Sequence, residues 1–246
     1  QFKQMVMISG FDKYFQIAPC FRDEDGRADR SPGEHYQLDM ELSFVEQEDV
    51  FKVVEPIFFD LFNEFGKGKK VSKIPFKKIT YKSSMLKYGT DKPDLRNPIE
   101  IFDVTTIFKR DDVKLDIFKK SIDKGSVVRA IPAPNTSFKP RSFFDDYNNW
   151  AKDEGGKGLG YIILEKNNGK LVGKGPIAKF FSEKAISELV KICKLKENDS
   201  VFFSSDKIKE AERISGMARQ KLGKELNLID INIFEFCWIT DYPMYQ

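Results

Sequence analysis

The chain has 246 residues, of which 41% are hydrophobic and 32% charged, and its formal net charge is +3. This length suffices for one large or two modest domains of a soluble globular protein. No run of about 18 uncharged apolar residues occurs, so no membrane-spanning helix is expected. The nearly neutral charge permits contact with nucleic acid but does not argue for it.

The cysteines indicate neither a metal site nor a set of disulfide bonds. Cys20, Cys193 and Cys237 are far apart, and the chain has one histidine. A structural zinc site needs about four such ligands, so we expect none. Free cysteines fit a reducing compartment, and we expect a cytoplasmic protein.

The chain starts at Gln1 without an initiator Met and lacks the apolar run of a signal peptide. It stops directly after an apolar run, so we expect further sequence on both sides.

The first part of the chain predicts an antiparallel hairpin. Residues 14–22 read as one strand and 37–44 as another, because apolar and polar side chains alternate in both. Residues 22–34 form a charged loop that contains Gly26, Pro32 and Gly33. Alternation places the polar residues of each strand on one face, and these are Gln16, Cys20, Arg22, Gln37, Asp39 and Glu41.

An amphipathic helix is expected over 48–65, with Gly66 as its C-cap and a kink or a new segment at Pro56. A short helix over 81–88 ends at Gly89. The pattern then predicts further elements of mixed type. They are helices at 116–124, 140–153, 182–194 and 206–222, and strands at 127–133, 160–165, 170–172, 201–203 and 232–239.

This order predicts an α+β protein with an interrupted first domain. Residues 1–100 would form part of one domain, 101–226 a self-contained inserted α+β domain, and 227–246 a return strand to the first domain. We assign the inserted domain no catalytic residue and interpret it as a packing module.

The polar hairpin face has two interpretations. Half of an antiparallel sheet often faces water, so its acids can simply be solvated there. The adjoining loop favours a binding site, because both signs of charge crowd into residues 22–30. An arginine at the end of a rigid strand can bind a phosphate through two nitrogens, and a nearby carboxylate can accept a hydrogen bond from an amino group.

The hairpin sequence is specific enough to show a resemblance. It resembles the second class-defining motif of bacterial class II aspartyl-tRNA synthetases, and the likeness extends over the chain. The segments that carry it are 10–30, Gln37-Leu38-Asp39-Met40-Glu41, Tyr88-Gly89-Thr90-Asp91-Lys92-Pro93-Asp94-Leu95-Arg96, the insertion signature Gly175-Pro176-Ile177-Ala178-Lys179-Phe180-Phe181, and Trp238-Ile239-Thr240-Asp241-Tyr242-Pro243-Met244.

The resemblance implies roles for the residues on and around this face. Arg22 would be the catalytic residue and bind the α-phosphate of ATP together with the attacking carboxylate of aspartate. Lys3 would pair with the side-chain carboxylate of L-aspartate. Asp39 would receive the α-ammonium group, with Gln37 beside it. The remaining implied contacts are Asp23, Glu24, His35 and Gln37 to ATP, and Arg27 and Arg30 to the acceptor end of tRNA.

One position departs from the family pattern. His35 stands where the family usually has a phenylalanine that stacks on adenine, and imidazole can stack with less area. An ordinary surface histidine is the alternative, and Tyr36 would be the stacking residue if the register shifted by one.

The resemblance also implies the reaction and its partners. ATP is a substrate, and the expected Mg²⁺ would have its ligands outside this chain. The expected partners are tRNA(Asp), L-aspartate, ATP and a second copy in a homodimer. The 246 residues by themselves are predicted to be inactive.

Three alternatives stay open. The first is a related synthetase for asparagine or lysine, which Lys3 and Asp39 together disfavour. The second is a ligase that charges both tRNA(Asp) and tRNA(Asn). The third, of another class, is a non-catalytic module that binds tRNA or protein.

Overall fold

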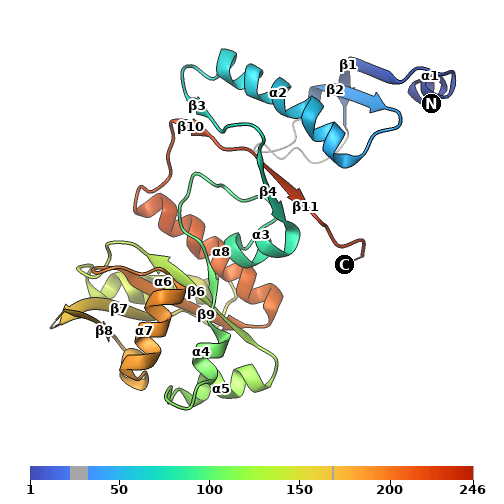
Figure 1. Cartoon of the computed structure of the whole chain (residues 1–246). Coiled ribbons are helices and arrows are strands. Elements are labelled where there is room, and N and C mark those ends of the chain that lie inside the picture. Colours follow the sequence, from blue (N-terminus) through green and yellow to red (C-terminus); the bar gives the residue numbers. More distant parts are fainter. Residues whose placement is uncertain (23–32, 168, 246) are drawn as a thin grey trace. The chain divides into compact units, whose positions relative to one another are not determined.

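The computed structural model describes residues 1–22, 33–167 and 169–245. The chain divides into two compact units. The first comprises Gln1–Lys67 and Lys73–Pro75, and the second comprises Gly68–Ser72 and Phe76–Gln246. The elements of both units can be followed in Figure 1, and each unit is described separately. No helix in the described ranges is both long and apolar enough to cross a bilayer.

The first unit is built on the expected hairpin. Strands β1 (Lys13–Phe21) and β2 (Glu34–Leu42) pair antiparallel, and the register runs from Lys13 opposite Leu42 to Phe21 opposite Glu34. Helix α1 (Phe2–Ile8) precedes β1 and was not predicted. Its seven residues are too few to show a clear helical period, and an isolated helix of this length is unstable without tertiary contacts.

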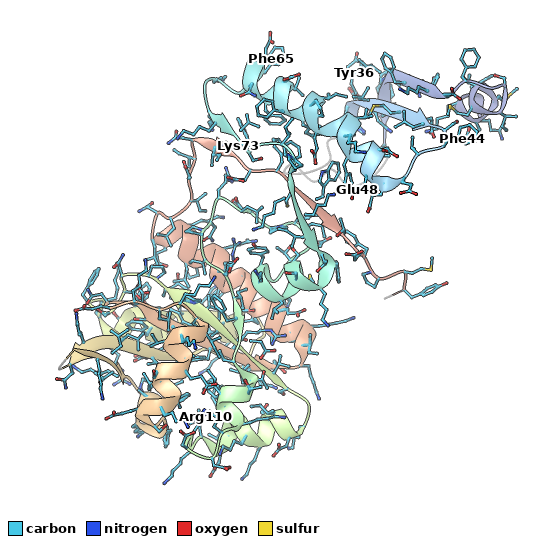
Figure 2. The ribbon with its side chains drawn as sticks, viewed as in Figure 1. Tyr36, Phe44, Glu48, Phe65, Lys73 and Arg110 are labelled. Carbon is cyan, nitrogen blue, oxygen red and sulfur yellow. The ribbon has the colours of Figure 1, made fainter. Side chains whose placement is uncertain are left out.

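Side chains alternate along the hairpin as the sequence predicts. The apolar face is the more exposed one: Phe15, Ile17, Phe21 and Tyr36 are all at least two-thirds exposed, and Tyr36 is labelled in Figure 2. The polar side chains of Tyr14, Gln16, His35 and Asp39 are half-buried instead. The polar face therefore does not consist of acids that are simply solvated.

Helix α2 (Gln47–Phe65) follows and confirms the expected amphipathic helix. It runs through Pro56 as one element, so no second segment begins there. Asp49 stabilises the first turn by accepting a hydrogen bond from the Glu46 N–H at 3.2 Å. Gly66 is the C-cap as predicted, at φ −76°, a conformation that does not require glycine.

The second unit contains a five-stranded antiparallel sheet in the order β5-β6-β9-β7-β8. Its strands are β5 (Phe102–Asp103), β6 (Val127–Ala133), β7 (Gly160–Asn167), β8 (Lys170–Lys174) and β9 (Ser200–Asp206). Its helices are α3 (Tyr81–Tyr88), α4 (Thr105–Lys109), α5 (Asp116–Asp123), α6 (Arg141–Asp153), α7 (Glu183–Ile192) and α8 (Ile208–Glu225), with a 3₁₀ turn η1 (Ala178–Phe180). The chain is thus a mixed protein of helices and antiparallel sheet.

Both faces of this sheet are covered by helices. Phe203 and Ile162 pack with α4, α5 and α7 on one face, whereas Phe202 and Tyr161 pack with α6 and α8 on the other. Because neighbouring residues of a strand point to opposite faces, the consecutive phenylalanines of β9 supply both cores. This explains why the apolar residues Val201, Phe202 and Phe203 of β9 follow one another without a polar residue between them.

Residues after 227 return to pair with an early part of the chain. The single strand expected over 232–239 is two short strands, β10 (Ile233–Phe234) and β11 (Cys237–Thr240). β10 pairs in parallel with β3 (Lys70–Val71), and β11 with β4 (Lys77–Thr80). Both partners lie within residues 1–100, far away in sequence.

Residues 76–100 belong to the second unit because α8 holds them. Gly89, in the left-handed conformation at φ +69°, contacts the backbone of Gly216. Fully buried Arg219 donates to the carbonyl oxygens of Ile99, Asp94 and Asn97 at 2.6–2.9 Å. The two compact units therefore divide earlier in the chain than residue 100, which is the position at which we expected a domain boundary.

Candidate functional site

The hairpin register brings the polar residues of the two strands together in cross-strand pairs. Gln16 lies opposite Asp39, Ala18 opposite Gln37, and Cys20 opposite His35. Directly opposite residues in an antiparallel pair have side chains on the same face, at contact distance. The predicted residues Gln37, Asp39 and His35 therefore share one face.

Lys3 reaches this face from α1. Its ammonium nitrogen lies 3.0 Å from Oδ2 of Asp39 and 2.8 Å from Oε1 of Glu41. The Lys3 and Asp39 side chains are 32% and 14% exposed, so the pair is partly shielded from water. The structure thus joins two residues that are 36 positions apart and that the sequence linked only through a resemblance.

The ion pair changes the acidity of both groups. Hydrogen bonds from Lys3 and then from Gln16 lower the pKa of Asp39 below its usual value of 3.8. Hydrogen bonds to Glu41 and then to Asp39 raise the pKa of Lys3 above 10.5. Asp39 is therefore an anion and Lys3 a cation at neutral pH, and the Lys3 ammonium group lies between the carboxylates of Asp39 and Glu41.

Two further residues complete the surroundings of Asp39, and the sequence did not assign them a role. Gln16 Nε2 donates to Asp39 Oδ2 at 3.1 Å. The hydroxyl of Tyr14 donates to Gln16 Oε1 at 3.0 Å. Alternation placed Gln16 on the polar face, but only the register shows that it lies opposite Asp39.

Gln37 and His35 occupy the part of the face nearer the loop. The Cys20 thiol donates to Gln37 Oε1 at 3.6 Å. Nδ1 of His35 is buried and has no hydrogen-bond partner among the described residues. Tyr36 points to the opposite face and is 77% exposed. The register therefore places His35, and not Tyr36, on the face that carries Asp39.

Arg22 directly follows β1. Its N–H donates to the carbonyl oxygen of Gly33 at 2.8 Å, which continues the hairpin pairing by one step. Its side chain is exposed, and no ion pair of Arg22 is found within the described residues. By alternation it lies on the side of Cys20 and Gln16. A guanidinium at a strand end can bind a phosphate through two nitrogens.

Four predicted residues lie outside the described residues. They are Asp23, Glu24, Arg27 and Arg30. In the described ranges, no group of three or more His, Cys, Asp or Glu side chains could hold a metal ion.

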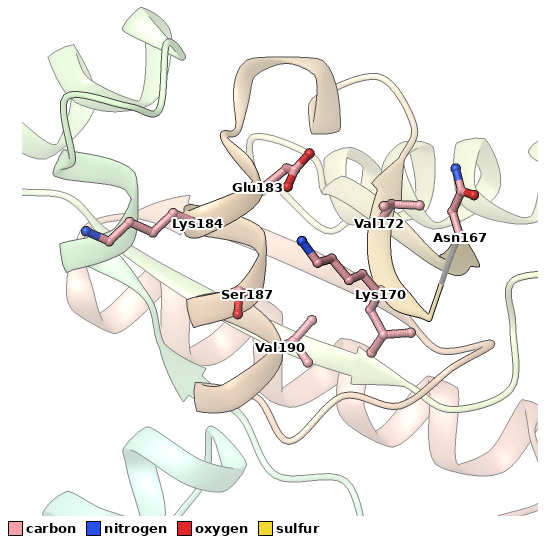
Figure 3. Close-up of a pocket in the computed structure, with 8 residues that line it drawn as sticks. Asn167, Lys170, Val172, Glu183, Lys184, Ser187 and Val190 are labelled. Carbon is pink, nitrogen blue, oxygen red and sulfur yellow. The ribbon is translucent and has the colours of Figure 1, made fainter.

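The second unit contains a separate cavity of about 730 Å³. Figure 3 shows Lys170 and Val172 of β8 on one side of it, and Glu183, Ser187 and Val190 of α7 on the other. None of the residues that the sequence singled out as a ligand contact lines this cavity. We therefore take the hairpin face as the candidate site.

Comparison with known proteins decides the family. The model of the class II tRNA synthetases for D, K and N matches residues 1–246. The chain belongs to this family. The resemblance of the hairpin to class II synthetases is thereby confirmed. The charged face formed by α1, β1 and β2 lies within the matched residues.

Curated relatives are similar over all of the chain. An aspartate--tRNA(Asp/Asn) ligase of Pelagibacter ubique (strain HTCC1062) is 56% identical over 246 residues, which are 100% of this chain and 41% of that protein. Ligases with the same name from Beijerinckia indica and Rickettsia canadensis are 55% and 56% identical over the same length, which is 41% and 40% of those proteins. The chain thus spans about two-fifths of the length of these class II relatives.

Proposed function

We propose that this chain supplies the aspartate-binding wall and part of the ATP-binding wall of an aspartate–tRNA ligase. The observation that carries the proposal is the Lys3–Asp39 pair, at 3.0 Å, on the same hairpin face as Gln37 and His35. The Lys3 ammonium group suits the side-chain carboxylate of an acidic amino acid, and the Asp39 carboxylate suits its α-ammonium group. The relatives named as aspartate ligases support this assignment.

In the first step, a carboxylate oxygen of aspartate attacks the α-phosphorus of ATP. The bond from that phosphorus to the bridging oxygen breaks, and pyrophosphate leaves. Arg22 would bind the α-phosphate and stabilise the charge that builds up there. Asp39 would bind the α-ammonium group, Lys3 the side-chain carboxylate, and Gln37 the substrate beside them. His35, Asp23 and Glu24 would contact ATP.

In the second step, a terminal ribose hydroxyl of tRNA attacks the acyl carbon of aspartyl-adenylate, and AMP leaves. Arg27 and Arg30 would contact the acceptor end of the tRNA. The names of the relatives favour a ligase for both tRNA(Asp) and tRNA(Asn) over one restricted to tRNA(Asp). The same names give no support to the non-catalytic module.

Mg²⁺ commonly assists transfer from ATP. The described residues provide no cluster of metal ligands, so no step is assigned to a metal on this chain. We further propose that residues 101–226 form an inserted domain, that 1–100 and 227–246 belong to the catalytic domain, and that the protein is a cytoplasmic homodimer.

Exchange of Asp39 for Asn tests the binding role. In the protein that contains this chain, Asp39→Asn should raise the KM for aspartate at least about tenfold, because the amide cannot replace a charged hydrogen-bond acceptor. Aspartate-dependent exchange of pyrophosphate into ATP measures this. Glu34→Gln is the matched control, since Glu34 is an exposed acid of the same strand on the other face. Equal KM values for Asp39→Asn and the unchanged protein would reject the proposal.

A further inference from the structure

Asp39 presents a specific problem for substrate binding. Its carboxylate is paired with Lys3, at 3.1 Å from Oδ1 and 3.0 Å from Oδ2. An incoming ammonium group has to share or displace that cation. If Lys3 alone oriented the carboxylate, Asp39 would lose its orientation at the moment when the substrate needs it.

Gln16 provides an orientation that does not depend on Lys3. Its Nε2 donates to Asp39 Oδ2 at 3.1 Å from the opposite strand, where the register places the two residues directly across from each other. An amide is neutral, so it does not compete with an ammonium group for the negative charge of Asp39. It still removes rotational freedom from the carboxylate.

The amide itself is held by Tyr14. A carboxylate can only accept hydrogen bonds, so the NH₂ group of Gln16 has to face Asp39 and Oε1 has to face Tyr14. The Tyr14 hydroxyl donates to Oε1 at 3.0 Å and fixes this orientation. The three residues therefore form a chain of hydrogen bonds that all point in one direction, and such bonds polarise one another.

We infer that Gln16 is a positioning residue for aspartate binding, and that Tyr14 holds it in place. Gln16 keeps the Asp39 carboxylate aimed at the substrate while Lys3 turns from Asp39 to the substrate carboxylate. Glu41, 2.8 Å from Lys3, keeps the lysine on this face during the exchange. The inference rests on the proposed function, because it requires Asp39 to bind the substrate ammonium group.

The kinetics of aspartate-dependent exchange of pyrophosphate into ATP, measured for three variants, test the hydrogen bonds from Tyr14 through Gln16 to Asp39. Gln16→Ala should raise the KM for aspartate about tenfold and change the KM for ATP less than about twofold, because only the aspartate contact loses its support. Tyr14→Phe should raise the KM for aspartate about threefold by the loss of one hydroxyl. The double variant should be no worse than Gln16→Ala alone, since Tyr14 acts through Gln16.

The outcomes separate the inference from the proposed function. An unchanged KM for aspartate in Gln16→Ala, together with a raised KM in Asp39→Asn, would overturn the role of Gln16 and leave the proposed function intact. Unchanged values in both would overturn the proposed function. Gln47→Ala, at the exposed start of α2, is the control for an exchange of glutamine for alanine. If Gln16→Ala did not fold, Tyr14→Phe would decide, because it removes a single oxygen: an unchanged KM for aspartate would overturn the inference.

Discussion

At the scale of residues, the proposed aspartate site depends on the ion pair between Lys3 and Asp39. The pair is short and only partly exposed, and each group has a second partner, Glu41 for Lys3 and Gln16 for Asp39. A pair supported on both sides can be opened by a substrate without either member leaving the face. This property fits the proposed binding site better than an ordinary surface ion pair, which contributes little to stability.

The pair has a defined dependence on pH. The pKa of Asp39 is lowered in the folded protein, so its stabilisation is complete above the unfolded value of 3.8 and is lost as the pH falls through the folded value. The pKa of Lys3 is raised, so its stabilisation is complete below 10.5 and is lost as the pH rises through the folded value. The stabilisation that the Lys3–Asp39 ion pair contributes should therefore be constant between about pH 5 and 9.

An NMR titration of the Asp39 carboxyl carbon checks this. The midpoint should lie below 3.8 in the unchanged protein and move upward in Lys3→Met, because the main hydrogen-bond donor is removed. Lys13→Met is the control, since Lys13 is an exposed lysine of β1 whose side chain points to the other face. A midpoint that did not move in Lys3→Met would show that the ion pair is not formed in solution.

At the scale of elements, α8 organises the second unit. It covers one face of the sheet through Ile214, Ala218 and Leu222, and it meets the end of α3 where Gly216 contacts Gly89. Burial lowers the pKa of Arg219, which still holds three carbonyl oxygens of the segment that follows α3. A guanidinium can satisfy several carbonyl groups of a buried irregular segment at once.

Gly216→Ala tests the contact between α3 and α8. A Cβ at Gly216 would lie 2.9 Å from both Cα and O of Gly89 and 3.0 Å from the carbonyl oxygen of Tyr88. Alanine favours a helix by about 1 kcal/mol, but displacing backbone costs about 1–3 kcal/mol, so we expect a net loss of stability of about 1 kcal/mol.

Thermal unfolding of Gly216→Ala against Gln220→Ala measures this. Gln220 lies at an exposed position of the same helix, where alanine meets no close contact. A Gly216→Ala protein as stable as Gln220→Ala would mean that α3 and α8 do not pack as described.

At the scale of the whole molecule, the sequence predicted the elements better than their partners. The strand over 127–133 and the helix over 81–88 have the predicted bounds, because each has a clear period and a clear end. Helix α1 and the short strands β3, β4 and β5 were missed. A two-residue strand such as β3 has no period of its own and forms only because a distant segment pairs with it.

Within the candidate site too, the sequence predicted which residues share a face better than it predicted their contacts. Alternation in the strand over 37–44 placed Gln37 and Asp39 on one face, as the structure confirms. The resemblance singled out Lys3, and the structure shows that it reaches that face. Gln16 and Tyr14 could not be assigned, because their roles depend on the cross-strand register, and the length of the loop did not fix that register.

The proposed function requires that the hairpin face bind aspartate and ATP for their reaction. Arg22→Ala tests it most directly, through aspartate-dependent exchange of pyrophosphate into ATP in the protein that contains this chain. Loss of a fixed positive charge at the α-phosphate should lower kcat at least about 100-fold, with an unchanged circular dichroism spectrum. Arg141→Ala, which removes an arginine that is 85% exposed in the second unit, should retain full activity. Nearly normal exchange in Arg22→Ala would show that the hairpin face is not the site of this reaction.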